Sequence, residues 1–383
     1  MRKPLLAKTK FSLYTFLLLV LLYPIILSIP NLFGVSSFFL TSPYFFGLFC
    51  LMSIFLFLRI KIPLHRYFIL LIGLLLISLY NFSTLRYSLP IFYISYIIVS
   101  MTFLNLLRKK SIDFGEIPII FFIYLILSMP FLFLENGWDE TNRFVGFVGS
   151  PTVYAGIMVS LYVIIAEKWK TTSPTFILIT MVVFCLVFLS KTRLVLIFIV
   201  LFPFMKFVLA KFHLLNKTRL FLLFFTVILC LYPLYNQVTK LIPSLVTVRY
   251  ENNRDASFGL RNYLSQDLLH QFEEGSVVEM AFGKGNEYSR IYVKKMFKFD
   301  LMPHNDFLRI LNDWGGLGLL LLLLFIYKLA VRNNRTLYLS VIYLLMFYSN
   351  MIFNLFLISL IIVFYFEDPE NHIEKNENQV LID

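Results

Sequence analysis

A single histidine stands at the end of the one long polar segment in an otherwise apolar chain. His304 lies in the Pro-His-Asn-Asp run at 303–306, which closes residues 236–313 just before a glycine-rich run at 315–318. An imidazole titrates near pH ~6.5, so it can accept a proton at neutral pH without special tuning. Most isolated histidines are structural. The position of His304 at an expected membrane surface nevertheless predicts a general base, with its neighbour Asn305 in a supporting role.

Three arginines lie in segments that we expect on the same side of a membrane as His304. Arg143 precedes a Ser-Pro-Thr run, Arg193 ends a short turn, and Arg261 lies near the start of an amphipathic pattern. Arg143 has a plain alternative as an interfacial anchor, and Arg261 as a surface salt bridge. Guanidinium groups stay charged and bind phosphate oxygens in pairs of hydrogen bonds. Together the three arginines predict a site for an anionic lipid headgroup such as a lipid pyrophosphate.

The turn that contains Arg193 supports this interpretation. Lys191 and Arg193 fall in the four residues 190–193, which form the whole connection between two apolar runs. Two cations on the outer side of so short a turn oppose the positive-inside rule. An arginine buried in a membrane costs ~2.5–3.5 kcal/mol even on lenient scales. We therefore expect this charge to face a polar cavity or a bound anion.

These residues must be positioned by apolar helices. Apolar residues make up 59% of the 383 positions and charged residues only 15%, which is outside the range of ordinary soluble domains. A helix needs ~20 apolar residues to cross a bilayer. The sequence predicts an all-α, polytopic integral membrane protein with about 12 transmembrane helices and one large external (periplasmic) loop. The expected spans are 11–29, 38–58, 67–80, 89–107, 117–134, 151–166, 174–189, 193–209, 219–235, 314–330, 337–350 and 352–366.

The distribution of charge sets the expected orientation. With the N-terminus inside, almost all of the formal net charge of +12 falls on cytoplasmic loops, as the positive-inside rule requires. The basic residues are scattered over short loops, so they indicate no nucleic-acid partner. We expect one membrane domain over 1–366, an external loop over 236–313, and a polar cytoplasmic tail at 367–383 that is disordered. Both termini are then cytoplasmic.

The external loop has its own helical pattern. Apolar residues recur every four positions, which predicts an amphipathic helix on the membrane face with Ser257 as its N-cap. Gly283 and Gly285 predict a turn, and the basic stretch 286–298 predicts a second helix. The residues of the apolar stripe are Leu260, Leu264, Leu268 and Phe272.

Over residues 120–366 the chain resembles a known family. It is similar to the O-antigen polymerase (Wzy-type) and O-antigen ligase (WaaL-type) superfamily. The resemblance depends on the order of several short motifs, each weak alone, with a large external loop before the third-last span. These motifs are Arg143-x-x-Gly146 leading into Ser150-Pro151-Thr152, Ser190-x-x-Arg193, Gly259-Leu260-Arg261, Phe282-Gly283-x-Gly285 and His304-Asn305-x-Phe307-Leu308.

The resemblance implies a metal-independent glycosyl transfer without a cofactor, in the bacterial inner (cytoplasmic) membrane. Undecaprenyl-pyrophosphate-linked glycans are the substrates it implies, with a flippase and a chain-length regulator as partners. His304 matches the family's catalytic base, and Arg193 and Arg261 match arginines that bind donor pyrophosphate. Arg143 matches a substrate-positioning arginine. Three readings stay open: a polymerase, which the sequence around His304 favours; a ligase that transfers glycan to lipid A-core; and a lipid-linked glycan transporter without chemistry.

Overall fold

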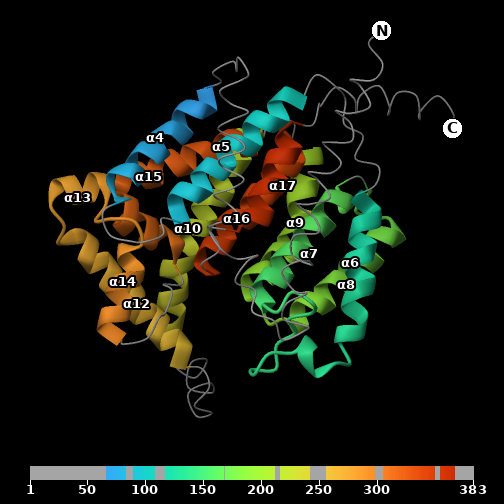
Figure 1. Ribbon diagram of the computed structural model, residues 1–383. Coiled ribbons are helices and arrows are strands. Elements are labelled where there is room, and N and C mark those ends of the chain that lie inside the picture. The colour runs from blue at the N-terminus through green and yellow to red at the C-terminus, as the bar shows by residue number, and fades with distance from the viewer. Residues whose placement is uncertain are drawn as a thin grey trace, which may run out of the picture.

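The computed structural model describes residues 66–82, 89–107, 117–167, 169–211, 216–241, 256–297, 305–349 and 354–366 (Figure 1). Within these ranges all regular structure is helical, and the only extended pairing is an isolated bridge between Trp138 and Phe144. The predicted all-α class is therefore confirmed for this part of the chain. The predicted spans 11–29 and 38–58 and the tail 367–383 lie outside the described residues.

Each predicted span that falls on described residues overlaps a helix. Of the described helices, α15 is long and apolar enough to cross a membrane, and the other apolar helices that qualify by composition are shorter. The helical arrangement agrees with a membrane protein, and the number of about twelve spans stays a prediction. The helices are α4 (Arg66–Tyr80), α5 (Leu89–Leu107), α6 (Ile117–Phe131), α7 (Pro151–Ala166), α8 (Pro174–Leu189), α9 (Arg193–Lys211), α10 (Lys217–Leu241), α15 (Asp306–Ala330), α16 (Asn334–Met346) and α17 (Leu355–Tyr365).

Two helices form the centre of the bundle. Helix α16 packs against α7, α9, α10, α15 and α17, and α7 packs against α6, α8, α9, α16 and α17. Nearly every side chain of these two helices is buried. Helices that are apolar on all sides need either a protein or a lipid environment on every face. They lie in the middle of the view in Figure 1.

The outer helices expose large apolar side chains. Ile126 on α6, Leu178 on α8 and Val200 on α9 are each more than 60% exposed. Many large apolar side chains exposed in this way are unusual on proteins that face water, whereas lipid covers them without cost. The outward faces of these helices therefore suit a bilayer.

Three further helices lie within the segment predicted as the external loop: α12 (Ala256–Glu273), α13 (Val277–Phe282) and α14 (Tyr288–Phe297). Helices form over both predicted segments, and Leu264 and Leu268 are buried in α12, which packs against α15. The placement of α12 on the membrane face stays a prediction. The predicted N-cap is wrong, because the helix already begins at Ala256 and Ser257 lies inside it.

Glycines let α13 approach the backbone of α15. Gly283 ends α13 with a φ of 91°, and a Cβ there would lie 2.2 Å from the carbonyl oxygen of Asp313. Gly315 has a φ of 73°, and a Cβ there would lie 2.3 Å from the carbonyl oxygen of Ala281. The Lys284 amide donates to the Asn312 carbonyl at 2.7 Å across this contact. No residue with a side chain fits either position.

The glycine-rich run at 315–318 is a kink within α15 and not its start. The helix begins at Asp306, and Asn305 is its N-cap, with the Asn305 side chain accepting a hydrogen bond from the Leu308 amide at 3.3 Å. A good cap can start a helix well before its apolar stretch. The predicted span 314–330 thus corresponds to the part of the helix beyond the kink at Gly315.

A buried polar network fixes this kinked helix to its neighbours. Asn286 donates from its side-chain amide to the Ser78 carbonyl at 2.7 Å, and its oxygen accepts from the Trp314 indole at 3.0 Å. The Ser289 hydroxyl donates to Asp313 at 2.7 Å. Buried polar groups with satisfied partners define a single arrangement. The network therefore holds the first half of α15, and with it Asn305, in a defined position.

Candidate functional site

The segment between α6 and α7 folds as a compact loop. It contains a single 3-10 turn, Glu135–Gly137, and it closes through backbone and indole hydrogen bonds. The Trp138 indole donates to the Leu132 carbonyl at 3.2 Å, and the Val145 amide donates to the Gly137 carbonyl at 2.9 Å. The loop thus has a defined conformation although its regular structure is limited to one 3-10 turn and one isolated bridge.

Aromatic side chains attach this loop to the bundle. The buried ring of Phe144 lies between Trp138 and Tyr154, with ring centres 5.4 Å and 5.1 Å away. Gly146 follows with a φ of 55°, and a Cβ there would lie 2.7 Å from the ring of Tyr154. The loop can therefore rest on α7 only with a glycine at this position.

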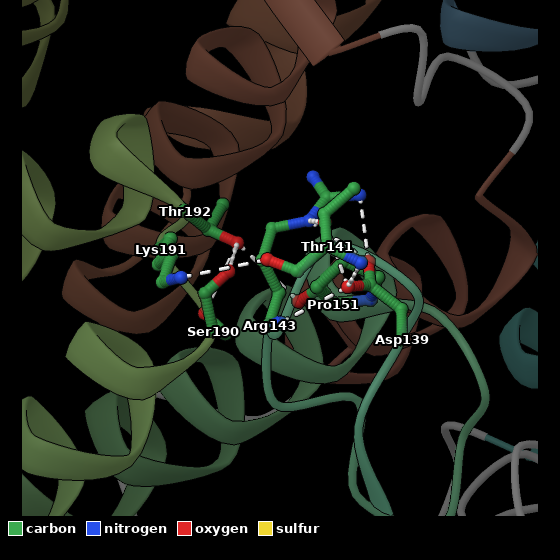
Figure 2. A network of polar contacts seen from close by, with 7 residues as sticks. All are labelled: Asp139, Thr141, Arg143, Pro151, Ser190, Lys191 and Thr192. Carbon is green, nitrogen blue, oxygen red and sulfur yellow. Dashed lines mark hydrogen bonds and ion pairs between the residues drawn. The ribbon is translucent and has the colours of Figure 1, made fainter. Parts of the chain in front are cut away.

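The loop holds Arg143 against a carboxylate (Figure 2). The Nε and Nη2 atoms of Arg143 both lie 2.8 Å from Oδ2 of Asp139, and Nε also donates to the Thr141 hydroxyl at 2.8 Å. The Arg143 side chain is 37% exposed. The guanidinium is therefore held in one orientation while it still reaches solvent.

The same carboxylate organises the loop backbone. Oδ1 of Asp139 accepts from the Thr141 amide at 2.9 Å, the Thr141 hydroxyl at 2.7 Å and the Arg143 amide at 3.0 Å. Partial burial by itself would raise the pKa of Asp139, but the hydrogen bonds from Thr141 and Arg143 outweigh it and lower the pKa below its ordinary value. Asp139 is thus a stable anion at neutral pH.

The turn between α8 and α9 carries the next two cations. Helix α8 ends at Leu189 and α9 begins at Arg193, as the sequence predicted. Lys191 has a φ of 52°, a left-handed conformation that costs a residue with a side chain roughly 1–2 kcal/mol. Both Lys191 and Arg193 are exposed. Strained residues of this kind concentrate at functional sites.

Hydrogen bonds join the loop to this turn. The Phe144 amide donates to the Leu189 carbonyl at 3.0 Å, and the Lys191 ammonium makes a long hydrogen bond of 3.5 Å to the Thr141 carbonyl. Figure 2 shows Thr141 and Arg143 of the loop beside Ser190 and Lys191 of the turn, with the hydrogen bond from Lys191 to Thr141 dashed. The loop and the turn, about fifty positions apart in the sequence, therefore lie side by side, and Arg143 and Lys191 are carried by these adjoining segments. Arg193 follows two residues after Lys191 at the start of α9, and we call Arg143, Lys191 and Arg193 the cationic cluster.

The remaining predicted site residues are described only in part. Arg261 lies in α12, but nothing is described of its side chain. His304 lies outside the described residues. Asn305 is buried and caps α15, which is a structural role that it can combine with any other. The structure brings Arg143 and Lys191 together, and their convergence with Arg261 and His304 stays a prediction.

Asp139 was not among the predicted site residues. The signal that identifies it is the spacing of Asp139, Thr141 and Arg143. A carboxylate followed two residues later by a hydroxyl and four residues later by a cation is typical of an Asx-type turn closed by an ion pair.

Comparison with known proteins supports the predicted relationship. Residues 175–323 match a family model described as O-Antigen ligase, a stretch that covers less than half of the chain. No curated protein and no solved structure matches. The matched stretch includes Arg193, Arg261 and His304, whereas Arg143 and its loop lie before it. The resemblance to the O-antigen polymerase and ligase superfamily is thereby confirmed.

Proposed function

We propose that this protein, which matches the O-Antigen ligase family model over residues 175–323, is a polysaccharide polymerase. Its substrates would be undecaprenyl-pyrophosphate-linked oligosaccharide repeat units at the outer face of the bacterial inner membrane. The sequence at 303–311 and the following glycines resemble the polymerase form of the motif. Transfer of the glycan to lipid A-core is the second candidate, and the description of the matching family as a ligase favours it.

The observation that carries this proposal is the cationic cluster. Arg143, Lys191 and Arg193 come from a loop and a turn that are hydrogen-bonded to each other, and Asp139 balances only one of the three charges. Like charges carried by adjoining segments repel one another, and a bound anion offsets that repulsion. Arg193 is the first residue of α9, where the helix dipole also favours an anion. A pyrophosphate diester supplies the anionic oxygens that this arrangement lacks.

In this proposal the arginines act on the departing pyrophosphate. Arg193 and Arg261 bind the donor pyrophosphate, and Arg143 positions it with support from Lys191. As the bond between the donor sugar and the pyrophosphate breaks, negative charge builds on the leaving oxygen. Guanidinium groups held at this position stabilise that charge. This would lower the barrier without a metal.

His304 acts on the acceptor in the same proposal. It removes the proton from the sugar hydroxyl that attacks the donor, a step that contributes ~10²–10⁴-fold in rate. The new glycosidic bond forms as the lipid pyrophosphate leaves. The buried network at Asn286, Ser289 and Asp313 supports this role, because it fixes the first half of α15, a helix that begins two residues after His304 in the sequence. Holding two lipid-anchored substrates side by side adds a proximity effect.

The cellular setting belongs to the same proposal. The protein would be a multi-pass inner-membrane protein with both termini in the cytoplasm and the 236–313 loop outside. A flippase would deliver its lipid-linked substrates, and a chain-length regulator would be a partner.

Deletion of the gene separates the two candidate reactions. If the protein is a polymerase, the mutant cells carry single repeat units on the lipid A-core. If it is a ligase, they carry a bare core. Purified protein in liposomes gives the complementary result: extension of lipid-linked repeat units supports an enzyme, whereas movement of the same lipid across the bilayer without extension supports a transporter and contradicts the proposal.

A further inference from the structure

The two oxygens of the Asp139 carboxylate have separate partners. Oδ1 accepts three hydrogen bonds from Thr141 and from the Arg143 amide, all of which shape the loop. Oδ2 accepts only from the Arg143 guanidinium, at 2.8 Å from both Nε and Nη2. One side chain therefore closes the loop with one atom and orients Arg143 with the other.

This geometry decides which edge of the guanidinium faces a ligand. Asp139 and Thr141 take Nε and Nη2, and within the described residues Nη1 makes no hydrogen bond or ion pair. The side chain remains 37% exposed. Arg143 thus leaves Nη1 available to a ligand, while the rest of its side chain is already held in one conformation.

Ordering a long side chain in advance lowers the cost of binding. A free arginine loses rotamer freedom when it binds a ligand, at a cost that corresponds to about three- to tenfold in affinity. Asp139 also reduces the repulsion between Arg143 and Lys191, whose ammonium bonds to the loop carbonyl of Thr141. Without this carboxylate, the two cations would tend to separate.

We propose that Asp139 is a positioning residue that holds Arg143 ready for the pyrophosphate of the lipid-linked donor. The inference rests on the proposed function for the identity of the ligand. The contact between Asp139 and Arg143 itself does not depend on that function. Asp139 touches the guanidinium and not the reacting atoms, so its effect is on donor binding.

The substitution Asp139→Asn separates the two tasks of the carboxylate. An asparagine keeps an oxygen in the place of Oδ1 and so keeps the loop closed. It puts an amide donor in the place of Oδ2, where it faces the donors of Arg143. Glu140→Gln is the matched control, because Glu140 is exposed in the same loop and the change in charge is the same.

The first measurement is the rate at which phenylglyoxal modifies Arg143 in the purified, detergent-solubilised protein, resolved by peptide mass spectrometry. The exposed Arg193 is the internal reference. We expect severalfold faster modification of Arg143 in Asp139→Asn and the wild-type rate in Glu140→Gln. Equal rates in the two variants would overturn the inference, whatever the activity assay shows.

The second measurement is extension of a lipid-linked repeat unit as a function of donor concentration. We expect Asp139→Asn to raise the donor KM about three- to tenfold and to change kcat little. An unchanged KM would overturn the positioning role. If Asp139→Asn does not fold, Arg143→Lys tests the same inference with the carboxylate intact. A lysine keeps the positive charge but loses the paired contact with Asp139, so it should raise the donor KM to a similar extent. A wild-type donor KM in this variant would also overturn the inference.

Protection by a sugar-free isoprenoid pyrophosphate distinguishes this inference from the proposed function. Farnesyl pyrophosphate should slow the modification of Arg143 in the wild-type protein and should do so less well in Asp139→Asn. If farnesyl pyrophosphate protects neither protein, Arg143 does not bind pyrophosphate, and the role given to Arg143 in the proposed function is contradicted. The modification rates without the probe still report whether Asp139 holds the guanidinium.

Discussion

The substitution Gly146→Ala should open the loop that carries Arg143. Gly146 has a φ of 55°, and a Cβ there would lie 2.7 Å and 2.8 Å from two ring atoms of Tyr154. That ring is fully buried on α7 and cannot move aside easily. The left-handed backbone costs an alanine ~1–2 kcal/mol, and forcing a methyl group into a packed contact adds ~1–3 kcal/mol. The loop conformation should therefore lose roughly 2–5 kcal/mol.

Hydrogen exchange of two loop amides measures this loss directly. The Phe144 amide donates to the Leu189 carbonyl and the Val145 amide to the Gly137 carbonyl, so both exchange only when the loop opens. A loss of 2 kcal/mol or more should speed their exchange at least ~30-fold. Amides in the middle of α7 should exchange at the wild-type rate.

Gly149→Ala is the matched control for the ring contact. Gly149 has a φ of 77° and is exposed, so an alanine there carries the backbone cost without burial against Tyr154. It should speed exchange less than Gly146→Ala does. Equal effects of the two substitutions would show that the ring contact does not hold the loop. Wild-type exchange in both would refute this account of the loop conformation.

Two further predictions concern the charged and capping residues. Arg193→Ala and Arg261→Ala should raise the donor KM more than the corresponding lysine substitutions do. The ammonium of a lysine keeps the charge but loses the paired hydrogen bonds that a guanidinium makes to phosphate oxygens. Full activity with lysine at both positions in an extension assay would contradict this prediction. Asn305→Ala should cost ~0.5–2 kcal/mol of stability by removing the N-cap of α15, measured by thermal unfolding, and Asn305→Ser should restore most of it. If Asn305→Ser restores stability but not glycan extension, the amide has a chemical role beyond the cap.

The apolar pattern predicted the positions of the helices well, because a long apolar run that must satisfy all its backbone hydrogen bonds internally can do so as a helix. Helices α7 and α8 begin and end within a residue of their predicted limits, and both start with a proline that cannot continue a preceding helix. The start of α15 was predicted less well. Its first turns mix charged and apolar residues and depend on the Asn305 cap and on contacts with α13, and a search for long apolar runs detects neither.

The candidate site was predictable in its cations and not in their arrangement. Arg143, Lys191 and Arg193 are conspicuous in the sequence because the predicted orientation puts them on the outer side of the membrane, where positive charge in short loops is unusual. Their approach depends on a backbone hydrogen bond from Phe144 to the end of α8, which depends on tertiary packing. The role of Asp139 was not predicted, because an acidic residue in a polar loop is common. Only the structure shows which donors its two carboxylate oxygens accept from.

The most direct test of the central claim is extension of undecaprenyl-pyrophosphate-linked repeat units by purified His304→Ala protein, with membrane insertion and thermal unfolding measured on the same sample. The account predicts a stably inserted protein that forms no polymer, because the acceptor hydroxyl keeps its proton. Polymer of wild-type length from this variant would contradict it.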